Sequence, residues 1–343
     1  MSGRANRRRP KGNNMEYARL GRTEAKVSRL IFGCGMIGGL MIKAEPEVML
    51  GAVRDAMAAG INWFDTAAQY GDGKSEENLG RVLAELSETP GISTKFKLRV
   101  EDGDIPGQIE RALEQSLKRL GMERVDLFQL HNNILLQASG NGLTPAQILG
   151  PGGVIESLER MRDQGLTKWL GVTAIGDARA CRQVIASGRV DTAQVYYNLI
   201  NPSSDFPAEM ADGPIAGGGH NFSGVLRACA DNDVGVIAIR TLAAGALAGD
   251  SYAGRGVITR DSEPDDERAK AGAVFDLLGD RYGTRAQTAL SFALAHPAIA
   301  CIDFAVAEPW QMIEGLKSVD LGPLPDDARA AVLALYQDNF GGT

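Results

Sequence analysis

Short apolar runs alternate with longer amphipathic segments from Val27 onward, and this pattern predicts repeated strand–helix units. The expected strands cover residues 29–32, 61–64, 92–94, 125–130, 169–172, 192–196, 234–239 and 299–304. The expected helices cover residues 46–59, 106–120, 154–164, 178–187, 224–232 and 310–318, with another capped at Ser75 and two pieces within 266–296. Eight parallel strands alternating with helices close a barrel, so the expected fold is an α/β fold, a single (α/β)8 TIM barrel.

Two connections in this pattern are too long and too rich in glycine to be simple turns. They cover residues 132–153 and 198–223, and both follow predicted strands. We expect them to be long loops at the C-terminal face of the barrel, where loops of this length cover binding sites.

Basic charge is concentrated at the N-terminus. Residues 1–14 hold five Lys or Arg residues and no acidic residue. This segment cannot bury a core, so we expect a disordered tail at 1–14 and a single barrel domain over 15–343. The tail is either a nucleic-acid or targeting arm or a solvated extension, and the natural start is either Met1 or Met15.

The rest of the chain is more acidic than the overall formal charge of -7, because the tail takes five of the basic residues. An acidic main body argues against nucleic acid or an anionic membrane as its partner. The sequence has no apolar run of about 18 residues, the length that would predict a membrane span.

Cysteine and histidine residues are scattered rather than clustered. Cys34, Cys181, Cys229 and Cys301 form no C-x-x-C pair, which is typical of reduced core cysteines in a cytoplasmic protein. The three histidines show no metal-ligand spacing, so we expect no metal site.

Four chemically active side chains lie at or just beyond the ends of successive predicted strands: Asp65, Tyr70, Lys95 and His131. A parallel barrel would bring all four to one mouth. A lysine can stabilise a tyrosine phenolate, a carboxylate can keep that lysine charged, and an imidazole can orient a carbonyl oxygen. Although each residue alone has an ordinary structural explanation, together they favour a general acid with its electrostatic support, as carbonyl reduction by hydride requires.

The motifs around these residues resemble those of the aldo-keto reductase superfamily over about residues 15–335. That resemblance implies a barrel that binds a nicotinamide cofactor, with Tyr70 as proton donor, Lys95 and Asp65 as its support, and His131 as carbonyl orienter. It also implies that Gln194 holds the cofactor carboxamide. The motifs that carry it are Leu20-Gly21-Arg22-Thr23, Phe64-Asp65-Thr66-Ala67 with Tyr70-Gly71, Ser93-Thr94-Lys95, and Asp126-Leu127-Phe128-Gln129-Leu130-His131.

The sequence departs from the family pattern at two cofactor positions. Thr173-Ala174 replaces a Ser-Asn pair, which removes an asparagine that helps to hold the carboxamide. Arg240 stands in a segment where the family often has an aromatic residue that stacks on nicotinamide. We expect Thr173 to remain a cofactor contact and Arg240 to supply a cation, for example to the pyrophosphate.

The expected cofactor is NAD(P)(H), with NAD(H) favoured over NADP(H). The family's basic residue for the 2′-phosphate falls near Ala307, which Glu308 follows, and residues 297–315 contain no Lys or Arg. An anionic 2′-phosphate would therefore lack its usual counter-charge.

Two alternatives remain open on the sequence alone. Gly33-Cys34-Gly35-Met36-Ile37-Gly38 matches the dinucleotide fingerprint of a Rossmann fold, although no helix is expected directly after it. In a barrel, Gly33 would instead begin a tight loop that lets the backbone approach a ligand. The altered cofactor positions also leave room for a redox-sensing regulatory subunit with little turnover.

The expected function is therefore interconversion of a small-molecule carbonyl (an aldehyde, ketone or sugar) and its alcohol, in a direction that the sequence leaves open.

Overall fold

Eight parallel strands form a closed barrel in the computed structural model of this chain, which describes residues 15–249 and 263–341. The barrel follows chain order, with the last strand closing against the first. It confirms the expected fold and excludes the Rossmann alternative, because that fold has an open sheet. The barrel strands are β3 (Leu30–Gly33), β4 (Trp63–Asp65), β5 (Gly91–Phe96), β6 (Val125–Leu130), β7 (Thr167–Thr173), β8 (Thr192–Tyr196), β9 (Gly235–Ile239) and β10 (Ile299–Ala305).

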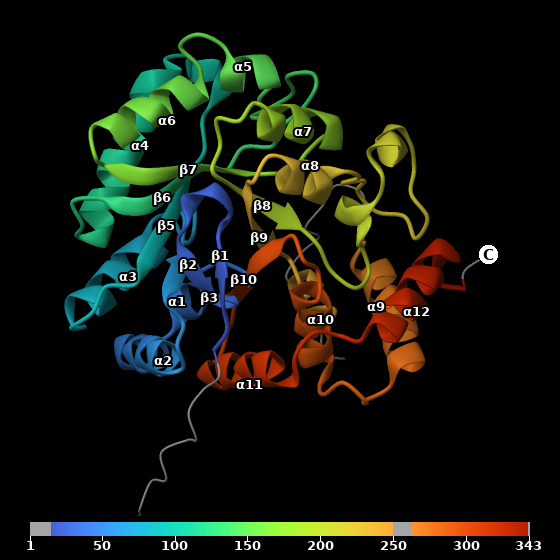
Figure 1. The fold of residues 1–343 in the computed structure, drawn as a ribbon. Coiled ribbons are helices and arrows are strands. Elements are labelled where there is room, and N and C mark those ends of the chain that lie inside the picture. Colours follow the sequence, from blue (N-terminus) through green and yellow to red (C-terminus); the bar gives the residue numbers. More distant parts are fainter. Residues whose placement is uncertain (1–14, 250–262, 342–343) are drawn as a thin grey trace, which may run out of the picture.

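Helices surround the barrel, and Figure 1 shows their order following the chain around it. The outer helices include α2 (Pro46–Ala58), α3 (Lys74–Ala84), α4 (Ile105–Leu120), α6 (Val154–Asp163), α7 (Ala178–Ala186), α8 (Val225–Asp231), α10 (Arg285–Leu294) and α11 (Pro309–Leu321). The predicted helices therefore exist. With α10, α9 (Pro264–Leu278) forms the two helical pieces expected within 266–296. The described residues also include the helices α1 (Leu40–Lys43), α5 (Pro145–Leu149) and α12 (Asp326–Gln337).

Side chains of the strands divide between two apolar cores. In β3, Leu30 and Phe32 belong to the large core beneath the helices, whereas Ile31 belongs to a smaller core inside the barrel. This alternation follows from the two-residue period of a strand. The inner core also contains Trp63, Leu127, Ile237 and Cys301.

An antiparallel hairpin closes the N-terminal end of the barrel. Its strands are β1 (Tyr17–Arg19) and β2 (Lys26–Ser28), and its Leu20 and Val27 join the inner core. Gly21 packs tightly against Gly235, at the start of β9. A Cβ at either glycine would overlap the backbone of the other segment. Since this end is closed, chemistry is confined to the opposite mouth.

The structure corrects four details of the sequence prediction. A short helix, α1, begins at Leu40, two residues after the glycine motif that ends at Gly38, where no helix was expected. Ser75 does not cap its helix: α3 begins at Lys74 after Gly73, whose left-handed backbone ends the preceding turn. The predicted loop 132–153 contains α5, and the unpredicted α12 follows α11. The predicted tail, residues 1–14, lies outside the described residues.

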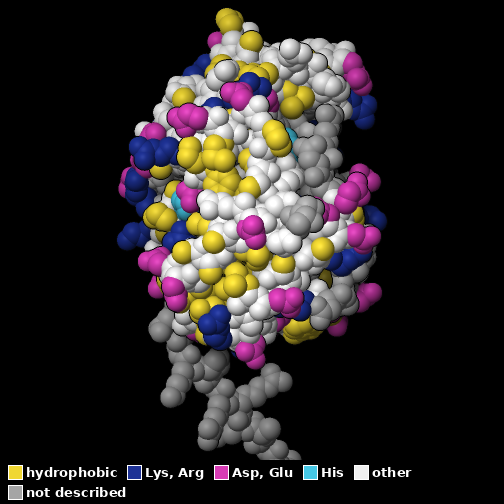
Figure 2. All heavy atoms as spheres, turned by 90° about the vertical axis from the view of Figure 1, so that its right-hand side faces the viewer, with side chains coloured by type: hydrophobic (Ala, Val, Ile, Leu, Met, Phe, Trp, Pro, Cys, Tyr) yellow, Lys and Arg dark blue, Asp and Glu magenta, His cyan; other side chains and the backbone are white. Residues whose placement is uncertain are grey.

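The surface is mixed in character. On the face in Figure 2, acidic and basic side chains are interspersed and hydrophobic side chains form several separate patches. Within residues 15–249 and 263–341, no helix has the length and apolar character needed to cross a membrane.

Candidate active site

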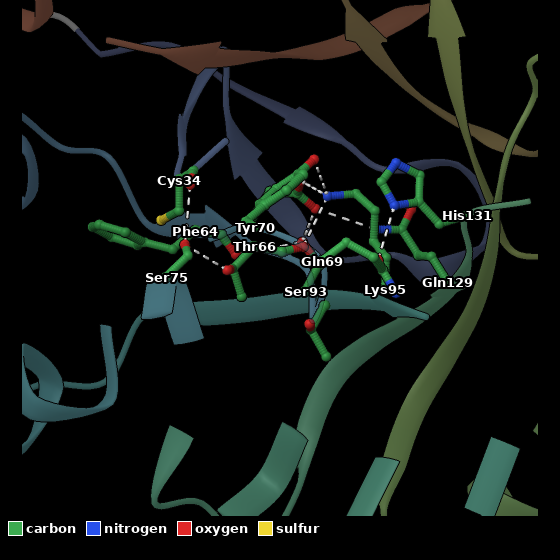
Figure 3. A network of polar contacts seen from close by, with 12 residues as sticks. Cys34, Phe64, Thr66, Gln69, Tyr70, Ser75, Ser93, Lys95, Gln129 and His131 are labelled. Atoms are coloured by element: carbon green, nitrogen blue, oxygen red, sulfur yellow. Dashed lines mark hydrogen bonds and ion pairs between the residues drawn. The ribbon is translucent and has the colours of Figure 1, made fainter. Parts of the chain in front are cut away.

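All four predicted catalytic side chains meet at the C-terminal mouth of the barrel. Asp65 ends β4, Lys95 is the penultimate residue of β5, and His131 directly follows β6. Tyr70 comes from the turn after β4. Figure 3 shows the side chains of Tyr70, Lys95 and His131 directed toward one another.

Lys95 lies at the centre of this cluster. Its Nζ forms an ion pair with Asp65 and donates to the carbonyl oxygen of Thr66 (2.8 Å) and to the hydroxyl of Tyr70 (3.1 Å). The side chains of Lys95 and Asp65 are both fully buried. All three donor positions of the ammonium are therefore occupied, and its charge lies beside the phenol.

Burial and the paired charges act in opposite directions on these groups. Burial lowers the pKa of Lys95, but the charge of Asp65 and the hydrogen bond with it outweigh that effect, so the net pKa is raised and the lysine stays charged. Burial also raises the pKa of Tyr70 by more than Lys95 lowers it. Tyr70 is therefore a protonated phenol at neutral pH, in the state from which an acid donates.

His131 is held neutral beside Tyr70. Burial lowers its pKa well below 6.5, and the nearby charges of Lys95, Lys97 and Arg240 lower it further. Nδ1 lies 3.3 Å from Gln69 Oε1, and the imidazole and phenol rings lie almost perpendicular with centroids 6.0 Å apart. An amide has both a donor and an acceptor group, so Gln69 can fix which ring nitrogen carries the proton.

The turn that carries Tyr70 is fixed from both sides. The hydroxyls of Thr66 and Ser75 pair at 2.9 Å, and Ser75 donates to the carbonyl oxygen of Cys34 at 3.0 Å. The amide of Tyr70 donates to the carbonyl of Ala67 at 3.0 Å. Ser75 is fully buried, which explains why it ties the turn to β3 instead of capping α3.

Two predicted cofactor contacts are neighbours with unmet hydrogen-bonding groups. Thr173, the last residue of β7, is the register partner of Gln194 in the middle of β8. The Oγ1 of Thr173 and the Nε2 of Gln194 are buried without a hydrogen-bond partner among the described residues. Since buried polar atoms are normally paired, these two groups fit a ligand such as a carboxamide, which has both a carbonyl and an amino group.

Arg240 follows β9 in a strained conformation. Its φ of 61° is left-handed, and Asn198 Nδ2 donates to its carbonyl oxygen at 2.9 Å. Nη1 is buried and lacks a partner in the part of the chain that the structure describes. Burial lowers the pKa of Arg240, while Tyr70, Tyr196 and Asp303 act in the opposite direction. The guanidinium is therefore a cation at the mouth with unused donor capacity.

The remaining predicted contacts lie on β3 and after β10. Gly33 ends β3 and is paired in register with both Asp65 and Ala305. Ala307 and Glu308 precede α11, and their amides donate to Gln311 Oε1 at 2.8 and 3.1 Å. The Glu308 side chain in turn accepts from the backbone of Gln311 in a capping box. A carboxylate thus occupies this helix N-terminus.

Comparison with known proteins identifies the fold family. A profile of the Aldo/keto reductase family matches residues 29–337. The chain belongs to this family. This membership agrees with the resemblance drawn from the motifs.

Individual aldo-keto reductase relatives are distant. L-galactose dehydrogenase of Arabidopsis thaliana is 28% identical over 47% of this chain and 49% of that protein. The NADP(+)-labelled aldo-keto reductase yakc of Schizosaccharomyces pombe is 26% identical over 64% of this chain and 59% of that protein. The alignments thus span only about half of these two relatives.

Two further matches cover nearly the full chain. A probable voltage-gated potassium channel subunit beta of Oryza sativa subsp. japonica is 24% identical over 90% of this chain and 93% of that protein. The holo form of aldo-keto reductase AKR11C1 from Bacillus halodurans superposes with a TM-score of 0.72 at 20% identity, over 94% of this chain and 97% of that chain. The structural match supports the barrel fold.

Three residues at this aldo-keto reductase mouth were given no role by the sequence. Ser93 Oγ donates to Asp65 Oδ1 at 2.6 Å, and Gln129 Nε2 donates to the same oxygen at 3.2 Å. Asp303 in β10 is a second buried acid of the mouth. All three lie an even number of residues from another inward-facing strand residue, so alternation along the strands could have identified them.

Proposed function

We propose that this aldo-keto reductase is a nicotinamide-dependent enzyme that interconverts a carbonyl and its alcohol, with Tyr70 as general acid and base. The observation that carries the proposal is the 3.1 Å hydrogen bond from Lys95 Nζ to the Tyr70 hydroxyl, with Lys95 held charged by buried Asp65. A cation fixed beside a phenol stabilises the charge that appears when the phenol gives up its proton.

Each of these residues at the mouth has a separate role in carbonyl reduction. Tyr70 donates its proton to the carbonyl oxygen, Lys95 stabilises the phenolate left behind, and Asp65 keeps Lys95 charged and in place. Neutral His131 orients the carbonyl oxygen by donating from Nε2, which requires the Gln69 amide to turn its NH2 group toward Nδ1, because a neutral imidazole carries a single N–H. In the reverse direction Tyr70 must first lose its proton, so alcohol oxidation should rise with pH while carbonyl reduction falls.

The cofactor side of the mouth fits a nicotinamide. Gln194 and Thr173 have buried, unpaired groups at register positions on adjacent strands, and these would hold the carboxamide. Arg240 would hold an anionic group of the cofactor such as its pyrophosphate, and Gly33 would let the backbone approach it. When bound, the nicotinamide supplies or accepts the hydride.

We further propose that the cofactor is NAD(H). Support comes from the capping box at α11, where the Glu308 carboxylate and the Gln311 amide use the helix N-terminus that follows Ala307. A 2′-phosphate near this position would meet a negative charge instead of a basic side chain. The NADP(+) label of the Schizosaccharomyces pombe relative points the other way, so the two cofactors must be compared directly.

A cytoplasmic location and a small-molecule substrate belong to the same proposal. All four cysteines are buried and free, which suits a reducing compartment. The name of the Arabidopsis relative makes aldoses a first substrate class to test, with oxidation as the physiological direction to examine.

One relative favours a second function. The rice protein is named as a channel subunit, and the present chain also has Arg240 where the family often has a stacking aromatic residue. A redox-sensing regulatory subunit would bind nucleotide with little turnover.

A screen of the full chain distinguishes these functions. Aldoses, pyridoxal-type aldehydes and aromatic aldehydes, with their alcohols, are tested with both cofactors, and nucleotide binding is measured separately by fluorescence. We expect turnover, with Tyr70→Phe lowering kcat/KM by at least about a hundredfold and Tyr282→Phe, outside the mouth, leaving it unchanged. Binding without turnover of any compound would favour the sensor, and full activity of Tyr70→Phe would require another proton donor.

A further inference from the structure

Asp303 carries a carboxyl into the barrel beside the tetrad. In β10, Ile302 and Phe304 pack in the outer core, while Cys301 packs in the inner core. Strand alternation therefore directs Asp303 inward, at a level where its register partner is Ile31 of the inner core. An acid at this position lies inside the barrel, two strands from Asp65 and three strands from Lys95.

Glycine at position 33 makes room for this carboxyl. A Cβ at Gly33 would overlap the Oδ1 of Asp303, so the carboxyl occupies the space of the missing side chain. Gly33 is also the register partner of Asp65. The Oδ1 of Asp303 is buried, and no described residue hydrogen-bonds to it.

The charges around Asp303 make its ionised form unfavourable. Burial raises its pKa well above 3.8, and the charge of Asp65 and a hydrogen bond between the two carboxyls raise it further. Lys95 and Arg240 act in the opposite direction without reversing the shift. Two carboxyls this close do not both ionise readily, because the second negative charge is opposed by the first.

We propose that Asp303 is a positioning residue that holds a proton against Asp65, so that Lys95 faces one negative charge rather than two. The neutral carboxyl of Asp303 donates its proton to the Asp65 carboxylate, which already accepts from Ser93, Gln129 and Lys95. The inference deepens the proposed function, since it sets the charge that Tyr70 experiences.

Every ionisable group that faces Asp303 fits this arrangement. Cys34 at the end of β3 and Cys301 on β10 are buried thiols whose pKa values are raised by burial, so neither contributes a charge at neutral pH. Arg240 and Lys95 are the cations. Ionisation of Asp303 would add a negative charge that raises the pKa of Tyr70, so Tyr70 would lose its proton only at higher pH.

Carbon-13 NMR of aspartate-labelled, cofactor-free protein tests the proton directly. We expect one aspartic carboxyl to remain protonated at about pH 7, and its signal to be lost in Asp303→Asn but retained in Asp326→Asn, where the aspartate is exposed on α12. Wild-type protein with every aspartate ionised at that pH would overturn the proposal, whatever the variants do. Because this measurement requires no turnover, its failure differs from failure of the proposed function.

Kinetics test the effect on Tyr70. We compare kcat/KM for alcohol oxidation in Asp303→Asn with that in the wild type. The ratio of variant to wild type should rise by roughly tenfold between about pH 7 and pH 10, because only the wild type gains the negative charge of an ionised Asp303 near Tyr70. A residue that merely supports packing would give a constant ratio, and that result would overturn the role assigned to Asp303.

Discussion

The two halves of the barrel mouth differ in how their buried polar groups are paired. At the ends of β4 to β6, the charged groups of Asp65 and Lys95 have hydrogen-bond or ion-pair partners on every side. Gln129 Oε1 is an exception in this half, because it is buried without a partner among the described residues. On the side formed by β7 to β10, four residues near the mouth have a buried polar atom with no partner among the described residues. These residues are Thr173, Gln194, Arg240 and Asp303.

This difference distinguishes the hydrogen bonds that the chain makes by itself from those that a bound ligand must make. A buried polar group without a partner costs about 1–3 kcal/mol. The fold accepts that cost at several neighbouring positions on one side of the mouth, and at Gln129 on the other. We infer that the paired half is ready for catalysis before any ligand arrives, whereas the unpaired half gains its hydrogen bonds when cofactor binds.

The largest effect should follow from breaking the paired half at Lys95. Lys95→Met leaves Asp65 buried without its cation, which should lower the free energy of unfolding by about 3–5 kcal/mol. Loss of the charge beside Tyr70 should also lower kcat/KM by at least about a hundredfold. Chemical denaturation and steady-state kinetics on the purified variant measure the two losses.

A second variant separates stability from catalysis. Adding Asp65→Asn to Lys95→Met removes the unpaired charge and should recover much of the stability, but none of the activity. Lys97→Met is the matched control, because Lys97 lies two residues after Lys95 and its side chain is exposed. Recovery of activity in the double variant would contradict the role assigned to Lys95.

The paired half was predictable because its signals are local in the sequence. The alternation of short apolar runs with amphipathic segments predicts the eight strands, with ends within two residues of those observed. The positions of Asp65, Lys95 and His131 follow from where the predicted strands end. Ser75 was misassigned because its hydroxyl bonds to Thr66 and Cys34, contacts that depend on how separate segments pack.

The unpaired half was less predictable because its meaning depends on contacts across strands. The sequence offered Thr173 and Gln194 only through resemblance, and their unmet hydrogen bonds became visible only with the register of β7 and β8. Asp303 was given no role, since the space that it fills is created by Gly33 on another strand.

Removing a group from the unpaired half should affect the ligand rather than the fold. Gln194→Leu replaces a buried amide that lacks a partner, so the stability of the cofactor-free protein should stay within about 1 kcal/mol of wild type. The dissociation constant for cofactor should rise roughly tenfold to a hundredfold, the effect of losing one or two buried hydrogen bonds. Thermal unfolding and fluorescence titration measure these values.

Thr192→Val is the matched control for that change. Thr192 also lies on β8 and has a buried, unpaired hydroxyl, but it is two residues deeper in the barrel. We expect normal cofactor affinity. If both variants weakened cofactor binding equally, position at the mouth would not matter and the comparison of the two halves would fail.

A smaller effect should follow from changing the charge after β10. Glu308→Arg replaces the carboxylate at the N-terminus of α11 with a cation, and should raise the NADP-to-NAD ratio of kcat/KM about tenfold, as one charge-assisted hydrogen bond would. Glu314→Arg, further along the same helix, should leave the ratio unchanged. A wild-type enzyme that already prefers NADP strongly would refute the expected NAD specificity.

The smallest effect concerns His131, at the boundary of the two halves. Burial lowers the pKa of His131 well below 6.5 in the folded protein, so as the pH falls below about 6.5 the unfolded chain takes up a proton before the folded chain does. Stability should therefore fall as pH falls below this value, by about 1.4 kcal/mol for each pKa unit of the shift. His131→Phe lacks this contribution, so its urea-unfolding free energy should depend less on pH than that of wild type. Identical pH slopes would show that His131 is not held neutral, and the carbonyl-orienting role would then need a charged imidazole.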